Sequence, residues 1–170
     1  MNSLTGRMAF LARDRPWLAL VISILAVEVI GASGGLFTAQ GLAGWYDSLV
    51  QPSIAPPRWV FGPVWTGLFG LMGLAVWLVW REFESRPSAV RVALSVFAVH
   101  FIANLGWSAA FFGARSIVGG LVMIALLWLL ILATMVAFGR VDRRAGWLLV
   151  PYLLWVSFAA VLNYQYWVLN

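Results

Sequence analysis

Charged residues divide this chain into five long apolar stretches. The stretches that contain no Asp, Glu, Lys or Arg are residues 59–80, 92–114, 116–139 and 145–170. Residues 16–46 form the remaining stretch, which holds one ionisable residue, Glu28. About 20 apolar residues of helix cross a bilayer core about 30 Å thick, and lipid obliges the backbone to satisfy its own hydrogen bonds. The pattern therefore predicts an all-α integral membrane protein, a bundle of five transmembrane helices.

The expected helices cover residues 16–40, 58–81, 89–113, 116–138 and 145–168, within a single transmembrane domain at residues 1–170. Short connectors after the second, third and fourth helices predict antiparallel neighbours. The connector at residues 41–57 is longer and rich in Gly and Pro, yet it carries Trp45, Tyr46, Leu49 and Ile54. A solvated linker would be more polar, so we expect this loop to fold back over an apolar surface as a lid.

The composition agrees with a membrane protein. Apolar residues make up 63% of the chain and charged residues 10%, compared with about 25% charged in soluble domains. The absence of Cys excludes a disulfide framework, a thiol nucleophile and a Cys-based metal site. The first apolar run is too long for the core of a signal peptide, and we interpret it as a retained first helix.

The placement of the 11 arginines predicts the topology. Nine lie in the N-terminus and in the second and fourth connectors, while Arg58 and Arg115 lie in the first and third. Because basic loops stay on the cytoplasmic side, we expect a cytoplasmic N-terminus, with the 41–57 loop and the C-terminus on the opposite side. The pI near 10.8 therefore reflects orientation, and we expect no nucleic-acid partner.

Tryptophan is in large excess, with 11 in the chain. Those near predicted helix ends, where indoles anchor at the membrane interface, are Trp17, Trp80, Trp147 and Trp167. Trp65, Trp107, Trp128 and Trp155 lie within the spans. They either fill the core, face lipid or form flat walls for a large flat ligand. No Ser-His-Asp arrangement, carboxylate pair, P-loop or metal-ligand cluster is present, so we predict no metal site.

Three blocks of sequence point to a known family. They are WYDSLVQPSIAPPRWVFGPVWTGLFGLMGLAVW from residue 45, ANLGWSAAFFG from residue 103 and VPYLLWVSFAAVLNY from residue 150. Together they resemble the tryptophan-rich sensory protein / translocator protein family. The resemblance implies a compact five-helix bundle, often dimeric, with a cavity closed by the loop after the first helix. It also implies a membrane receptor or sensor that binds porphyrins, protoporphyrin IX or haem, in tetrapyrrole transport or regulation and needs no cofactor. The alternative is an enzyme that degrades protoporphyrin IX in light, as some bacterial members are reported to do.

The family motifs assign a ligand-binding set in this chain. Its members are Trp45, Tyr46, Trp65, Asn104, Trp107, Trp155, Ala159, Leu162 and Asn163. Trp155, Ala159 and Leu162 share one helix face, where the small residue leaves a notch for a planar ring. If the protein is an enzyme, Trp45 and Trp155 are the candidate catalytic residues.

The resemblance also bears on partners. The third helix tends to carry the dimer contact in this family, so a homodimer through Gly106 and Ala110 is expected; Gly31 and Gly35 form a GxxxG on the first helix. The family's sterol motif lacks its Arg, because Val168 takes that position. Specific sterol binding is therefore not expected.

Glu28 and His100 lie near the middle of predicted helices and do not belong to the family pattern. Ionisable groups at that depth are functional candidates. The open alternatives are a neutral buried Glu28, a His100 bound to a backbone carbonyl, a Glu28–His100 pair, and a haem-ligating His100. An Asn inside a span, such as Asn104, must also find a partner, either a backbone or a ligand acceptor.

Overall fold

The computed structural model describes residues 14–170, apart from the side chain of Ala43. Its α-helices are α2 (Pro16–Gly41), α3 (Phe61–Trp80), α4 (Pro87–Ser108), α5 (Ile117–Val141), α6 (Arg143–Trp147) and α7 (Val150–Leu169). Short turns of π-helix at η1 (Leu42–Tyr46) and η3 (Ala109–Gly113) extend α2 and α4, and a 3₁₀ turn at η2 (Arg58–Val60) precedes α3. No strand occurs in the part that the structure describes. Five helical segments are long and apolar enough to cross a membrane, which confirms the predicted fold class.

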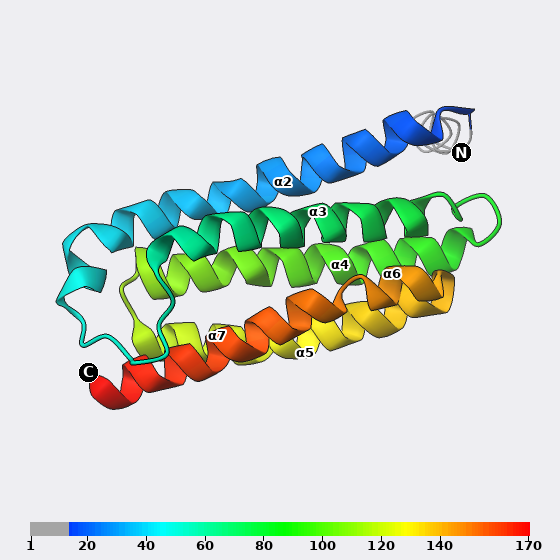
Figure 1. Cartoon of the computed structure of the whole chain (residues 1–170). Helices are drawn as coiled ribbons and strands as arrows, with labels where there is room; N and C mark the ends of the chain where they lie inside the picture. The colour runs from blue at the N-terminus through cyan, green and yellow to red at the C-terminus, as the bar shows by residue number, and fades with distance from the viewer. Residues whose placement is uncertain (1–13) are drawn as a thin grey trace.

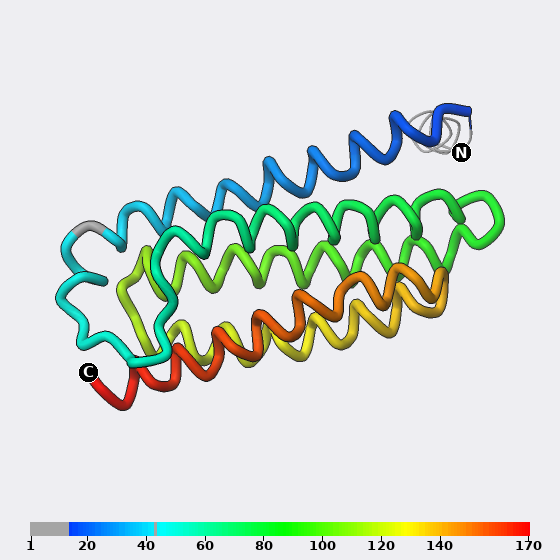
Figure 2. Tube along the Cα trace, in the orientation of Figure 1, coloured from blue at the N-terminus to red at the C-terminus, as the bar shows by residue number. Residues whose placement is uncertain are grey.

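The predicted fifth helix is broken in the structure. The sequence predicts one helix at residues 145–168, but α6 ends at Trp147 and α7 begins at Val150, and the helical ribbon is interrupted between them (Figure 1). The Cα trace nevertheless continues in nearly the same direction (Figure 2). Pro151 is the reason, because its ring clashes with the carbonyl four residues earlier, which belongs to Trp147. Pro151 therefore sits in the first turn of α7, where a proline is tolerated.

The predicted lid also begins differently. Its first residues, Leu42–Tyr46, continue the first helix as π-helix and are not an irregular loop. The chain turns at Gly44, whose φ of +88° favours glycine. Residues 47–57 then cross the end of the bundle toward the C-terminus before the chain returns to α3 (Figure 1).

The helices form a bundle in which α2 packs on α3, α4 on α5, and α5 on α7 (Figure 1). The contact between α2 and α3 depends on glycine. A Cβ on Gly73 would lie 2.5 Å from Ile24 Cα, and one on Gly31 would lie 2.6 Å from the ring of Phe69. Gly35 has nothing within 4 Å, so only the first glycine of the predicted GxxxG makes a close helix contact inside the bundle.

Gly106 of α4 and Ala110 of η3, the turn that extends α4, lie against α5 of the same chain. A Cβ added to Gly106 would lie 2.8 Å from Met123 Cε, and one added to Gly119 would lie 3.7 Å from Ala110 Cβ. Gly106 and Ala110 both remain partly exposed. The homodimer through Gly106 and Ala110 stays a prediction.

Most arginines gather at one end of the bundle. The guanidinium of Arg86 donates to the carbonyls of Arg140 and Val141, both at 3.4 Å, which joins the second and fourth connectors. The N-terminal end of α2 lies at the same end (Figure 1). Arg58 and Arg115 lie at the opposite end with the lid. Arg7 and Arg13, which also entered the topology prediction, lie outside the described residues.

Glu28 and His100 do not form a pair. Glu28 faces α3, where its Oε1 would lie 3.7 Å from a Cβ on Gly70. His100 is fully buried beside the rings of Phe97 and Tyr152, with centroids 5.3 Å away in each case. Neither ring nitrogen has a hydrogen-bond partner among residues 14–170, so the backbone-carbonyl alternative is wrong as well.

Candidate ligand-binding site

The lid is fastened to α7 by a chain of buried hydroxyls. Tyr46 and Tyr166 are both buried, and their hydroxyl oxygens are hydrogen-bonded at 2.5 Å. Tyr166 also donates to Gln51 Oε1 at 2.5 Å, and Gln51 Nε2 donates to the carbonyl of Tyr46 at 3.0 Å. These bonds fix the π-helical start of the lid to the extended part that follows it.

A second fastening lies at the end of α7. The carboxamide of Asn170 accepts from the backbone N–H of Val50 at 2.8 Å and donates to the carbonyl of the same residue at 3.3 Å. Asp47 forms an ion pair with Arg58, whose guanidinium lies over the ring of Tyr46 at 5.7 Å. The lid is therefore held at both of its ends.

Beneath the lid, five members of the predicted set, Tyr46 among them, lie in or beside one aromatic cluster. The ring of Phe111 meets that of Trp45 edge-on, with the centroids 5.4 Å apart, and stacks on that of Trp107, with the centroids 5.7 Å apart. Trp107 Nε1 donates to Asn163 Oδ1 at 3.3 Å. Leu162 is buried in the same cluster. The structure thus brings residues from the lid, α4 and α7 together, as the resemblance implies.

Other members of the set lie between α3 and α7. The rings of Trp65 and Tyr152 meet edge-on with their centroids 6.2 Å apart, and those of Phe61 and Trp155 meet edge-on with their centroids 5.8 Å apart. Asn104 donates to the hydroxyl of Tyr152 at 2.6 Å. The partner that Asn104 needs inside its span is therefore the hydroxyl of Tyr152, where a backbone or ligand acceptor was expected.

Ala159 is half-buried and packs against the main core, as does Trp155 one turn before it, while Leu162 packs under the lid. The shared face of α7 thus links the α3–α7 contacts to the lid cluster. The predicted set occupies one half of the bundle, the half covered by the lid.

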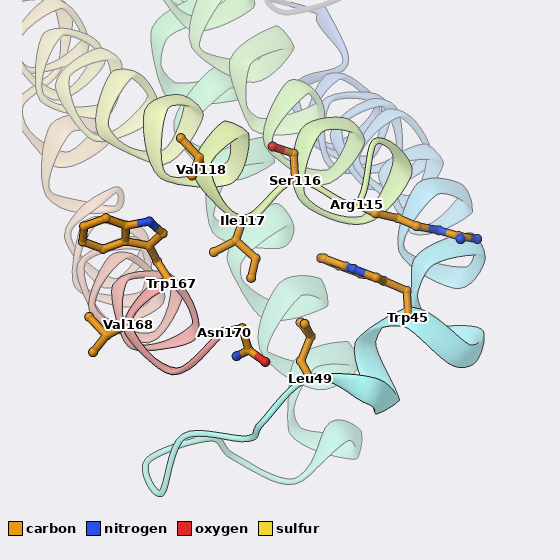
Figure 3. A pocket seen from close by; sticks show the side chains of 9 residues that line it. All are labelled: Trp45, Leu49, Arg115, Ser116, Ile117, Val118, Trp167, Val168 and Asn170. Atoms are coloured by element: carbon orange, nitrogen blue, oxygen red, sulfur yellow. The ribbon is translucent and has the colours of Figure 1, made fainter.

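A pocket of about 870 Å³ opens where the lid, the start of α5 and the end of α7 meet (Figure 3). Trp45 and Trp167 stand on opposite sides of it, with Ile117 between them (Figure 3). Its lining residues are Trp45, Leu49, Arg115, Ser116, Ile117, Val118, Trp167, Val168 and Asn170. Trp45 is the one member of the predicted set that lines this pocket. Below we call it the rim pocket.

Arg115 supplies a positive charge at the rim pocket. Its φ of 51° is left-handed, which costs a residue with a side chain about 1–2 kcal/mol. Its side chain lies beside the indole of Trp45 and extends outward (Figure 3). No carboxylate among residues 14–170 forms an ion pair with it, whereas Arg58, the other arginine at this end, is paired with Asp47. The same described residues contain no group of three His, Cys, Asp or Glu that could hold a metal ion.

Sequence reasoning missed several residues of this region. Phe111, Tyr152 and Tyr166 were not assigned to the site. Phe111 and Tyr152 each join two predicted members, and Tyr166 joins Tyr46 to Gln51. The available signal was the pair of tyrosines inside the last helix, because a buried tyrosine hydroxyl needs a partner. Trp167 was interpreted as an interface anchor and Arg115 as a topology determinant, but both line the rim pocket.

Known proteins resemble this chain over most of its length. The model of the TspO/MBR family matches residues 23–168. The Tryptophan-rich protein TspO of Chlorobaculum tepidum is 46% identical over 157 residues, which cover 90% of this chain and 96% of that protein. The Tryptophan-rich sensory protein of Cereibacter sphaeroides is 39% identical, with 91% and 92% covered, and the Translocator protein of Homo sapiens is 37% identical, with 89% and 90% covered.

Proposed function

The chain belongs to the TspO/MBR family, and from this premise we propose that it is a membrane receptor for porphyrins such as protoporphyrin IX or haem, in tetrapyrrole transport or regulation. The observation that carries the proposal is the rim pocket, where two indoles and an unpaired arginine face one opening about 870 Å³ in volume. Pockets that hold compact organic ligands have volumes of about 300–1,000 Å³.

The chemistry of the rim pocket suits a flat ring that carries carboxylates. The ring of a porphyrin stacks on the indole of Trp45 or Trp167, and Ile117 adds apolar contact between them. A propionate at the edge of the ring pairs with the Arg115 guanidinium, which forms charge-assisted bonds to carboxylates. The guanidinium extends outward beside the indole of Trp45 (Figure 3), so it can pair with a propionate at the outer edge of a ring that stacks on Trp45.

The remaining members of the predicted set lie behind the lid, packed against one another. A ligand in the rim pocket touches Trp45 and Leu49 of the lid. It also touches Asn170, which fastens the lid through Val50. Binding is therefore coupled to lid position, because the ligand and the fastening bonds share these residues. A ligand that displaces the lid gains access to Trp107, Leu162 and Asn163.

Quenching of tryptophan fluorescence by protoporphyrin IX, in the dark and in lipid nanodiscs, tests the proposal. We expect saturable quenching by the unmodified protein. Arg115→Asn keeps a residue that tolerates the left-handed backbone but removes the charge, so Kd should rise about tenfold, the effect of one charge-assisted hydrogen bond. Arg115→Lys should recover part of the loss. The control is Arg143→Asn at the opposite end, which should bind like the unmodified protein.

Two outcomes would contradict this proposal. Absence of saturable quenching would exclude a porphyrin receptor. If Ala159→Phe abolished binding while Arg115→Asn had no effect, the ligand would lie inside the bundle at the notch between Trp155 and Leu162, not in the rim pocket. Ala133→Phe, on the exposed face of α5, is the matched control for added bulk.

Light-dependent degradation of bound protoporphyrin IX is the second candidate, favoured by the position of Trp45 in the rim pocket. Indoles are oxidisable, whereas phenylalanine keeps an aromatic wall without that chemistry. A Trp45→Phe/Trp155→Phe protein should retain most binding but bleach the bound porphyrin more slowly under illumination, followed by absorbance. If porphyrin bound to the unmodified protein bleaches no faster than free porphyrin, catalysis is excluded and only the receptor function remains.

A further inference from the structure

A second hollow lies at the other end of the bundle, far from the lid. It is a groove of about 400 Å³ between the first half of α2 and the facing surfaces of α3 and α4. α2 lies oblique to both of these helices (Figure 1). The residues that form its walls include Ser23, Val27, Val76, Trp80, Phe97 and Phe101. Because Ile22 and Ile30 at its edge are 40% and 50% exposed, the groove opens toward lipid.

Among the described residues that line this groove, Ser23 is the one with a hydroxyl, amide or charged side chain, and it is 4% exposed. Its hydroxyl has no hydrogen-bond partner among residues 14–170. Hydroxyls inside a helix usually bond to a carbonyl of the preceding turn, as Thr134 does to Leu130 and Ser157 to Leu153 in this chain. An unpaired hydroxyl in hydrocarbon is unfavourable. The Ser23 hydroxyl is therefore suited to an acceptor that comes from outside the protein.

Two arginines lie at the mouth of the groove. Arg81 follows Trp80 directly, and the guanidinium of Arg91 lies over the ring of Phe83, another lining residue, at 5.7 Å. Arg81 contacts Glu82 at 3.6 Å in an exposed pair, which solvent weakens. Arg91 is exposed and has no carboxylate within ion-pair distance among the described residues. An anion at the mouth would therefore meet Arg91 first.

The arginines, the Ser23 hydroxyl and the apolar walls follow one another along the groove. The charged headgroup, the ester linkage and the acyl chain of a phospholipid have the same order. The arginines are at the membrane surface, and Ser23 lies about 10 Å along α2 from Pro16, at 1.5 Å of rise per residue. Beyond Ser23 the walls are apolar as far as Phe101. We infer that the groove is a binding site for an anionic diacyl phospholipid, with its phosphate at Arg91 and Arg81, an ester carbonyl at the Ser23 hydroxyl and an acyl chain against Phe97 and Phe101.

A second copy of the chain fits this groove less well. A two-fold interface over the groove would bring the same surface of each copy together. Arg81 and Arg91 of one copy would then face the same arginines of the other copy, and these like charges repel. An anionic headgroup neutralises the same charges, as polybasic segments at membrane surfaces do.

Photo-crosslinking in vesicles tests the site. The protein is reconstituted in phosphatidylcholine with a trace of phosphatidylglycerol that carries a diazirine on one acyl chain, and labelled peptides are mapped. Adducts should concentrate on the α2, α3 and α4 segments that line the groove. Ala26→Trp, which fills the groove, should remove most of them. Val29→Trp is the matched control, because Val29 is on the same helix, 70% exposed and outside the groove.

Two further variants separate the polar contacts from the apolar ones. Ser23→Ala should lower groove labelling about threefold, the effect of one hydrogen bond of about 0.6 kcal/mol within a membrane. Arg91→Gln should reduce the preference for the phosphatidylglycerol probe over a phosphatidylcholine probe of the same chain. Removal of an unpaired hydroxyl should leave the melting temperature of Ser23→Ala at or above that of the parent protein, which shows that lower labelling does not reflect unfolding.

Three results would overturn the inference. Even labelling of the whole lipid-facing surface, unchanged by Ala26→Trp, would mean that the groove holds ordinary solvating lipid. Crosslinks from a photoreactive residue at position 26 to a second copy would assign the groove to a dimer. Displacement of the lipid probe by protoporphyrin IX would assign it to the porphyrin instead.

Discussion

Tyr152 and Asn104 form a hydrogen bond of 2.6 Å that ties α7 to α4 inside the bundle. Both side chains are buried, so neither has water as an alternative partner. Tyr152→Phe keeps the ring contacts with Trp65 and His100 but leaves the Asn104 amide unpaired. The free energy of unfolding should fall by about 1 kcal/mol, as measured by thermal or denaturant unfolding in micelles.

Tyr164→Phe is the control for this prediction, because Tyr164 is 53% exposed on the same helix. It should leave stability unchanged. If the two variants unfold alike, the Asn104–Tyr152 bond contributes nothing measurable. Substitution of both partners, Asn104→Leu with Tyr152→Phe, should recover much of the loss, since no amide is then left unpaired.

At the residue scale, the sequence predicts which polar groups need partners but not which partners they find. Asn104 inside an apolar span had to be hydrogen-bonded, yet its partner is 48 positions away on another helix. The same holds for Trp107 and Asn163, which the resemblance placed in one set without showing the bond between them. The rotation of each helix about its axis decides these pairs, and a pattern of apolar residues this uniform does not determine that rotation.

At the scale of elements, the lid depends on Tyr166 for much of its order. The hydroxyl of Tyr166 bonds to both Tyr46 and Gln51, and no other side chain among the described residues joins these two parts of the lid to α7. Tyr166→Phe should loosen residues 47–57 without unfolding the bundle. Amide hydrogen exchange in this segment should accelerate several-fold, while exchange in α3 and α5 stays unchanged.

The second fastening of the lid provides the comparison. Asn170→Ala removes the bonds to Val50 and should accelerate exchange near Val50 more than near Tyr46. Unchanged exchange in both variants would mean that apolar packing of Trp45 and Leu49 alone holds the lid closed.

The helices also show which parts of the fold the hydropathy pattern predicts. Five apolar stretches gave five transmembrane segments, with boundaries that differ from the structure by a few residues at most ends. The break between α6 and α7 was missed because hydropathy is uniform across it. Pro151 carried the information, since its ring excludes a helical carbonyl at Trp147. The π-helical turn at Leu42–Tyr46 has no comparable marker in the sequence.

At the scale of the whole molecule, the distribution of arginine gives the bundle two unlike ends. The described arginines at the end without the lid are Arg15, Arg81, Arg86, Arg91, Arg140, Arg143 and Arg144. The lid end has Arg58, paired with Asp47, and Arg115 at the rim pocket. Each end has one hollow, because the rim pocket opens at the lid end and the groove between α2, α3 and α4 lies toward the arginine-rich end. Their ligands would therefore bind without competing for space.

The same asymmetry predicts the orientation in the membrane, with the arginine-rich end in the cytoplasm. Because the chain has no Cys, a single introduced cysteine reports on one position without background. Ser53→Cys lies in the exposed part of the lid, and Ser85→Cys lies in the exposed connector between α3 and α4. A membrane-impermeant maleimide added to intact cells should label Ser53→Cys and leave Ser85→Cys unlabelled until the membrane is permeabilised. The reverse pattern would invert the topology and place the rim pocket on the cytoplasmic side.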